Sequence, residues 1–136
     1  MQVTRSTRLV AGVQLGTLVL TIAAGFGCFA LTHDRRLETF ISVPIAIAGA
    51  IIVAWLALTQ LPPAQPREAG ALKGHALLHL VLFLMFGLSA GYLEATRTYE
   101  WAVLNAVLIA AYIGLVPTYA AMAYASWTRA RRALMR

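Results

Sequence analysis

Charged residues are absent from four long stretches of this 136-residue chain. Residues 9–31, 40–61, 77–93 and 101–127 contain no Lys, Arg, Asp or Glu, although the chain has eleven basic and five acidic residues. A water-soluble domain needs a polar outer surface, and the short segments between these stretches are too small to form a domain of their own. The chain therefore lacks the composition of a soluble protein.

Cysteine is almost absent as well, and so are the groupings of polar side chains that catalysis needs. Cys28 is the only cysteine, which excludes an internal disulfide bond and a thiolate cluster. The apolar stretches contain no carboxylate pair, no pairing of a nucleophile with a base and no glycine-rich phosphate loop. We therefore expect no enzymatic activity and no cofactor.

Most residues of the chain are apolar. It is 60% hydrophobic, and its mean hydropathy is +0.74. At a rise of 1.5 Å per residue, each stretch is about long enough to cross a hydrocarbon core of about 30 Å. Because lipid offers no hydrogen bonds to the backbone, such segments must be helices. The sequence predicts an all-α integral membrane protein with four transmembrane helices in a tight bundle.

These helices form one domain over residues 1–136, arranged as two hairpins. We expect the first hairpin over 9–61, a proline- and glycine-containing loop over 62–74, the second hairpin over 75–127 and a basic tail over 128–136. Each hairpin is apolar apart from its short charged turn, so no separate soluble unit is expected.

The basic residues are unevenly divided between the two sides of such a bundle. One side has Arg5, Arg8, Arg67, Lys73, Arg129, Arg131, Arg132 and Arg136, and the other has Arg35, Arg36 and Arg97. The positive-inside rule then predicts that both termini are cytoplasmic, in a bacterial inner (plasma) membrane. The basic tail would face anionic lipid headgroups, so we expect membrane lipids, and no nucleic acid, as its partners.

Small residues recur at four-residue spacing in several of the stretches. The rows are Gly12 and Gly16, Gly87 and Gly91, and Ala106, Ala110 and Gly114. Such rows let two helix backbones approach closely, which is how helices associate in lipid. They fit ordinary packing inside the chain, and the alternative is contact with another membrane subunit or a second copy.

Polar residues inside the stretches are neutral. Asn105, Tyr112 and Tyr119 recur every seven residues, and Gln14 lies in the first stretch. Amides and hydroxyls in lipid need partners, so this stripe should either join helices or line a crevice for a headgroup or small ligand. This polar stripe and the row of small residues at 106, 110 and 114 lie on different sides of the fourth helix. We therefore expect one of these sides to face another chain.

The few titratable residues allow two predictions, one about metal binding and one about charged pairs. His75 and His79 have the i, i+4 spacing of metal ligands, but only Glu68 on the same side could join them, so we expect no metal site. The pairs Arg35/Glu38 and Arg97/Glu100 should be solvated at the outer surface.

Two functional hypotheses follow from this pattern. The first is a non-catalytic accessory or assembly subunit of a larger bacterial inner-membrane complex, either respiratory or envelope-building. The alternative is a small oligomeric membrane transporter or channel with a neutral path lined by Tyr and Asn. Without a buried acid or base, proton-driven transport by this chain alone is not expected.

Overall fold

The computed structural model describes residues 4–96 and 102–135, and all its regular elements in those ranges are helical. They are α1 (Arg5–Thr32), α2 (Arg35–Thr59), a short 3-10 helix η1 (Pro66–Glu68), α3 (Ala69–Thr96) and α4 (Ala102–Leu134). Each of the four α-helices is long and apolar enough to cross a membrane. The prediction of an all-helical chain with four candidate membrane spans is confirmed.

The first hairpin closes through a turn of only two residues, His33 and Asp34. His33 has the left-handed φ of 54°, and its N–H donates to the Phe29 carbonyl at 2.8 Å, which ends α1. The Asp34 carboxylate then accepts from the Arg36 N–H at 2.8 Å and caps the start of α2. As a result α2 begins at Arg35, before its apolar stretch.

The helices extend beyond the apolar stretches at several other ends. In the expected loop over 62–74, the Gln65 N–H donates to Glu68 Oε2 at 2.8 Å, and Pro66 occupies the first position of η1. As a result α3 begins at Ala69, five residues before the expected end of that loop. At the other end of the chain α4 continues to Leu134, so most of the expected tail is helical.

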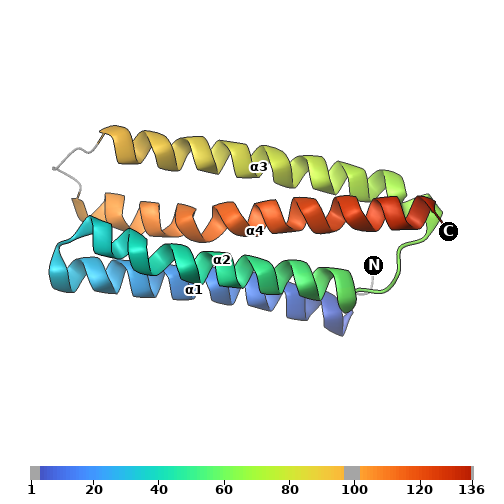
Figure 1. Cartoon of the computed structure of the whole chain (residues 1–136), viewed down its shortest axis with the longest axis horizontal. Coiled ribbons are helices and arrows are strands. Elements are labelled where there is room, and N and C mark those ends of the chain that lie inside the picture. Colours follow the sequence, from blue (N-terminus) through green and yellow to red (C-terminus); the bar gives the residue numbers. More distant parts are fainter. Residues whose placement is uncertain (1–3, 97–101, 136) are drawn as a thin grey trace.

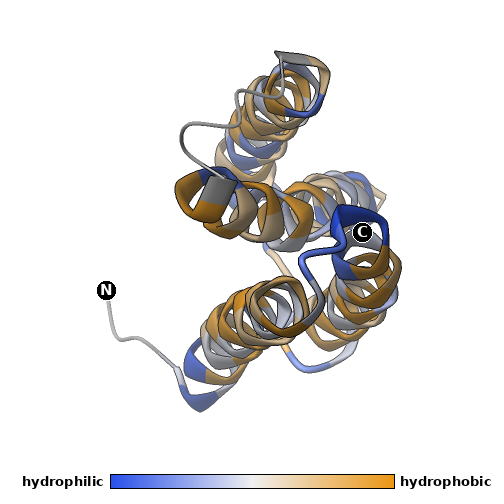
Figure 2. Ribbon diagram, turned by 90° about the vertical axis from the view of Figure 1, so that its left-hand side faces the viewer, coloured by the Kyte–Doolittle hydropathy of each residue, from blue (hydrophilic) through white to orange (hydrophobic). Residues whose placement is uncertain are grey.

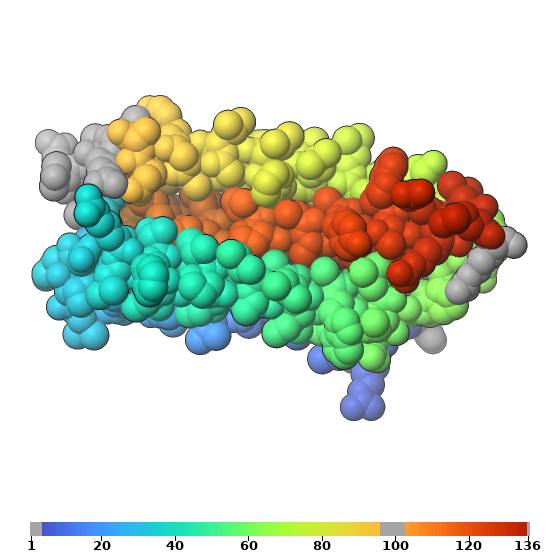
Figure 3. Space-filling view, in the orientation of Figure 1, coloured from blue at the N-terminus to red at the C-terminus, as the bar shows by residue number. Residues whose placement is uncertain are grey.

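Helix α4 lies at the centre of the arrangement, between α3 and the α1–α2 hairpin (Figure 1). It contacts the other three α-helices, whereas α3 contacts only α4 and η1 within the described ranges. In the space-filling view α4 forms a band between α3 and α2 (Figure 3). The bundle is thus less compact than expected, because α3 packs on the outside of a three-helix unit.

Small side chains fill the interior of this unit, and large apolar ones face outward. Ala46 of α2 and Ala110 of α4 are fully buried, while Leu31, Phe40 and Leu88 are 86%, 76% and 75% exposed. Hydrophobic residues cover most of each helix (Figure 2). A soluble protein buries many of its large apolar side chains, whereas helices in lipid can expose them. The pattern is that of a multi-pass membrane protein.

Candidate functional site

Three polar side chains share one face of α2 in its first two turns. Arg35, Glu38 and Ser42 are spaced three and four residues apart, and the same face continues through Ala46 into the core. Glu38 is only 1% exposed, and Ser42 is completely buried. The cap at Asp34 is what makes this segment helical, and the helical period then turns Glu38 and Ser42 inward.

The cluster lies where α1, α2 and α4 meet. A β-carbon added to Gly25 of α1 would overlap the Ser42 hydroxyl oxygen. The same β-carbon would lie 3.2 Å from the Ala110 Cβ of α4 and 3.5 Å from the Glu38 Cγ. Glycine at residue 25 therefore allows the three helices to close around the Glu38 and Ser42 side chains.

Several polar atoms of the cluster are buried without a hydrogen-bond partner within the described part of the chain. They are Arg35 Nη1, Glu38 Oε1 and Ser42 Oγ. The Arg35 guanidinium carbon lies 5.8 Å from the centre of the Phe29 ring, in cation–π range. Glu38 is also within electrostatic range of Arg35 and of Glu94 on α3. Unsatisfied buried polar groups are costly, so this cluster is the strongest candidate for a functional site.

Two expectations from the sequence are corrected here. Glu38 is not part of a solvated surface pair, and the helices do enclose a carboxyl group. The reason is local, because Asp34 starts a helix in a segment whose charged residues resemble a loop. The four-residue spacing of Glu38, Ser42 and Ala46 was the available signal in the sequence. The other pair, Arg97 and Glu100, lies outside the described residues.

The polar stripe of α4 does not form one crevice. The rings of Tyr112 and Tyr119 each lie 5.5 Å from the Phe86 ring of α3, centre to centre, and Tyr119 stacks on it at 11°. Asn105 is 7% exposed, and Gln14 lies half-buried on α1, which does not contact α3 in the described part. The two tyrosine rings pack against Phe86 in the α3–α4 contact, and Gln14 lies apart from them.

The row of small residues in α4, which is Ala106, Ala110 and Gly114, packs inside the chain. It lies on a different side of α4 from the tyrosines. Ala106 and Ala110 are completely buried. A β-carbon on Gly114 would lie 3.2 Å from Leu18 Cδ1 and 3.3 Å from the Thr21 Cβ, both on α1. Because α3 contacts the tyrosines and α1 contacts Gly114, neither side needs another chain to cover it, and contact of α4 with another chain stays a prediction.

The other glycine rows are not helix contacts within the described part of the chain. Nothing lies within 4 Å of where a β-carbon would stand at Gly12, Gly16, Gly87 or Gly91. The close approaches occur instead at Gly25 and Gly49, which the spacing rule did not single out. Gly25 follows Thr17 and Thr21 at four-residue intervals, and that buried row was its signal.

The two spaced histidines of α3 make local contacts. His79 Nδ1 lies 2.6 Å from the His75 carbonyl oxygen, and the His79 ring centre lies 6.0 Å from that of Tyr119. Among the described residues, no group of three or more His, Cys, Asp or Glu could hold a metal ion. His75 and His79 therefore do not assemble a metal site there.

The Glu38 cluster can hold a proton, a water molecule or a small cation, because it offers a buried carboxyl oxygen beside a hydroxyl. No protein-family model matches the chain, and no curated protein or solved structure shows significant similarity to it.

Proposed function

We propose that this chain is a non-catalytic accessory or assembly subunit of a larger bacterial inner-membrane complex, with both termini in the cytoplasm. The uneven distribution of basic residues supports the orientation. The four apolar helices and the lack of any long hydrophilic segment in the sequence support a role that depends on helix packing.

One observation carries the proposal: two glycine rows lie outside the close helix contacts of the described part of the chain. Gly12 and Gly16 lie on the side of α1 away from its buried row, and Gly87 and Gly91 have nothing within 4 Å of a β-carbon position. A glycine facing lipid offers no side chain to pack, whereas a glycine row facing another helix permits close backbone contact. A partner helix on α1 or α3 would use these rows.

The packing of the core also favours a subunit over a channel through the monomer. Below Glu38 and Ser42, the inner face of α2 continues with Ala46, Val53 and Leu56, which are at most 7% exposed. Apolar side chains close this contact over most of the length of α2. A polar route across the bundle would need further polar side chains along this face.

The experiment is purification of the tagged chain from its own membranes in mild detergent. We expect partner proteins in fixed stoichiometry, and their loss in Gly16→Leu and Gly91→Leu while the helical content stays unchanged. Ala48→Leu, which enlarges a small residue on the exposed face of α2, is the matched control and should keep the partners. A chain that purifies as a lone monomer would contradict the proposal.

A second candidate function, a small oligomeric transporter, is favoured by the buried Glu38. An acid enclosed by helices is typical of proton and ion paths in membranes. The polar group of such a path would then be Glu38, because the Tyr112 and Tyr119 rings pack against Phe86. Proteoliposomes with a trapped pH-sensitive dye and an imposed potential test it. Proton flux that Glu38→Gln abolishes would favour the transporter over the subunit.

A further inference from the structure

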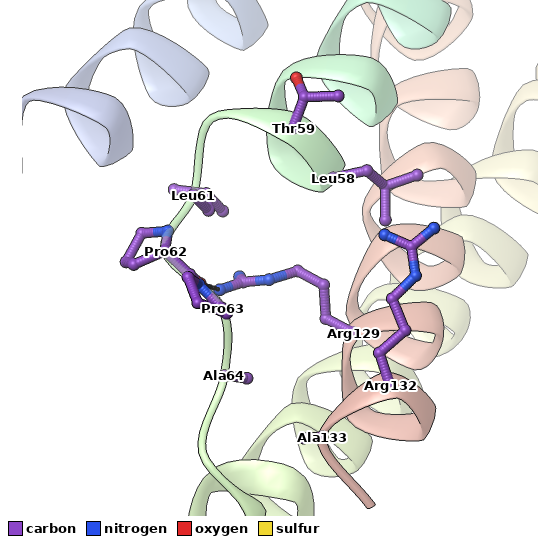
Figure 4. Close-up of a pocket in the computed structure, with 9 residues that line it drawn as sticks. All are labelled: Leu58, Thr59, Leu61, Pro62, Pro63, Ala64, Arg129, Arg132 and Ala133. Atoms are coloured by element: carbon purple, nitrogen blue, oxygen red, sulfur yellow. Dashed lines mark hydrogen bonds between the residues drawn. The ribbon is translucent and has the colours of Figure 1, made fainter. Parts of the chain in front are cut away.

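A cavity of about 230 Å³ lies at the end of the bundle where α2 ends and the following loop crosses α4 (Figure 4). Its lining combines apolar and basic residues: Leu58, Thr59, Leu61, Pro62, Pro63, Ala64, Arg129, Arg132 and Ala133. This end also contains the basic last turns of α4, and it lies far along α2 from the Glu38 cluster.

Arg129 is held in a fixed place at this cavity. Its Nη2 donates to the Pro62 carbonyl oxygen at 2.8 Å, a bond between residues 67 positions apart in the chain. Figure 4 shows the Arg129 side chain extended toward Pro62, with Arg132 directed toward Leu58. The bond fastens the loop to α4 and leaves the other guanidinium N–H groups of Arg129 able to bind a ligand.

Arg132 adds a second guanidinium from the next turn of α4. The two arginines are three residues apart, which places them on one side of the helix. Glu68 acts electrostatically on Arg129, but it does not line the cavity, and its Oε2 accepts from the Gln65 N–H at 2.8 Å. The charged residues of the lining are Arg129 and Arg132, so the lining is basic, with donors in the planar geometry that suits phosphate oxygens.

The rest of the lining suits the part of a lipid next to its phosphate. Leu58, Leu61 and Pro63 are apolar residues of the lining, and α2 and α4 are both apolar enough to span a membrane. An inorganic phosphate ion would gain nothing from that surface, whereas a glycerol backbone and the first methylenes of an acyl chain would bury against it. Basic pockets between helices at the cytoplasmic side are typical headgroup sites.

We infer that this cavity binds the phosphate of one anionic phospholipid, with Arg129 and Arg132 as its ligands and the Leu58–Pro63 segment against its glycerol region. The site would couple the loop and the end of α4 to the lipid composition of the membrane. A subunit and a transporter could both use this site, so the inference does not rest on either role; only the cytoplasmic position of the cavity rests on the proposed orientation.

The test is native mass spectrometry of the full chain in detergent with added phosphatidylglycerol or phosphatidylcholine. We expect one tightly bound phosphatidylglycerol per chain, with affinity lowered on the order of fivefold or more in Arg132→Gln and little changed for phosphatidylcholine. Arg131→Gln removes an equal charge from an exposed neighbour that does not line the cavity, and it should bind as the wild type does.

Two outcomes would overturn the inference. Equal losses in Arg131→Gln and Arg132→Gln would show that the basic helix end attracts anionic lipid without a specific site. Inorganic phosphate that displaces the lipid at millimolar concentration, with the same dependence on Arg132, would show that the free ion is the ligand. Circular dichroism of each variant keeps these results separate from unfolding, and Arg132→Lys should recover part of the lost affinity.

Discussion

Gly49 of α2 packs directly against the side chain of Thr17 on α1. A β-carbon added at residue 49 would overlap the Oγ1 and Cγ2 of Thr17 and lie 2.8 Å from its Cβ. Thr17 is buried, and its hydroxyl donates to the Val13 carbonyl at 2.8 Å. Since both branches and the Cβ of Thr17 would be too close, a rotation of this side chain cannot make room for a larger residue.

Gly49→Ala should therefore destabilise the protein by about 1–3 kcal/mol, the usual cost of overpacking a core. Unfolding of the variant by increasing SDS in mixed micelles, followed by circular dichroism, measures this change. Gly12→Ala is the matched control, because nothing lies within 4 Å of its β-carbon position. An equal effect of the two substitutions would show that Gly49 is not at a close helix contact.

Phe86→Ala should weaken the attachment of α3 to the rest of the chain. Phe86 contacts Tyr112 and Tyr119, and aromatic pairs contribute about 0.5–1.5 kcal/mol each, so we expect a loss of about 1–3 kcal/mol. The same SDS titration measures the loss. Phe40→Ala removes the same ring from a side chain that is 76% exposed, and it should change the unfolding free energy much less. A larger effect at Phe40 would contradict the described α3–α4 contact.

Glu38→Gln should not destabilise the helix bundle. Oε1 of Glu38 has no hydrogen-bond partner in the described part, and glutamine has nearly the same shape without the carboxyl group. We expect the unfolding free energy to stay constant or to rise by about 1 kcal/mol, because an unsatisfied buried carboxyl is costly. A loss above about 2 kcal/mol would instead mean that the charge of Glu38 holds the helices together, as a buried ion pair does.

The sequence was sufficient to predict the helical class and the number of candidate spans, but it did not predict which residues face inward. Hydropathy marks the apolar centre of each helix, while the ends at Asp34 and Gln65 depend on capping hydrogen bonds. Glycine spacing was equally ambiguous, because α1 has one row facing inward at Gly25 and another facing outward at Gly16. Only the packing of whole helices distinguishes these two rows.

The position of Glu38 shows the same limit for the candidate site. Its charged neighbours Arg35 and Arg36 resemble an exposed loop, and the carboxyl is nevertheless 1% exposed. Glu38 and Ser42 are four residues apart, so they lie on one side of a helix. This spacing predicts that Glu38 points inward only if α2 is known to begin before it. The heptad of Asn105, Tyr112 and Tyr119 did correctly indicate a protein-facing stripe, because the two tyrosines contact α3.

Reporter fusions test the proposed orientation. Fusions at Pro63 and at the C-terminus should behave as cytoplasmic, and a fusion near Arg97, outside the described residues, should be exported. The physical reason is that most basic residues lie at the side that would remain in the cytoplasm. An exported C-terminus would reverse the orientation, and it would also place the arginine-lined cavity on the outer side.

The most direct test of the proposed subunit role is crosslinking in native membranes. Replacing Cys28, the only cysteine, gives a background in which single cysteines can carry a photocrosslinker. Probes at residues 20 and 84 replace exposed leucines one turn from Gly16 and Gly87, so they leave the glycines in place. From these two positions we expect adducts with a different polypeptide of defined mass. A probe at residue 48, on the exposed face of α2, should react with lipid alone. Adducts with lipid alone, or only with a second copy of this chain, from residues 20 and 84 would contradict the proposed subunit role.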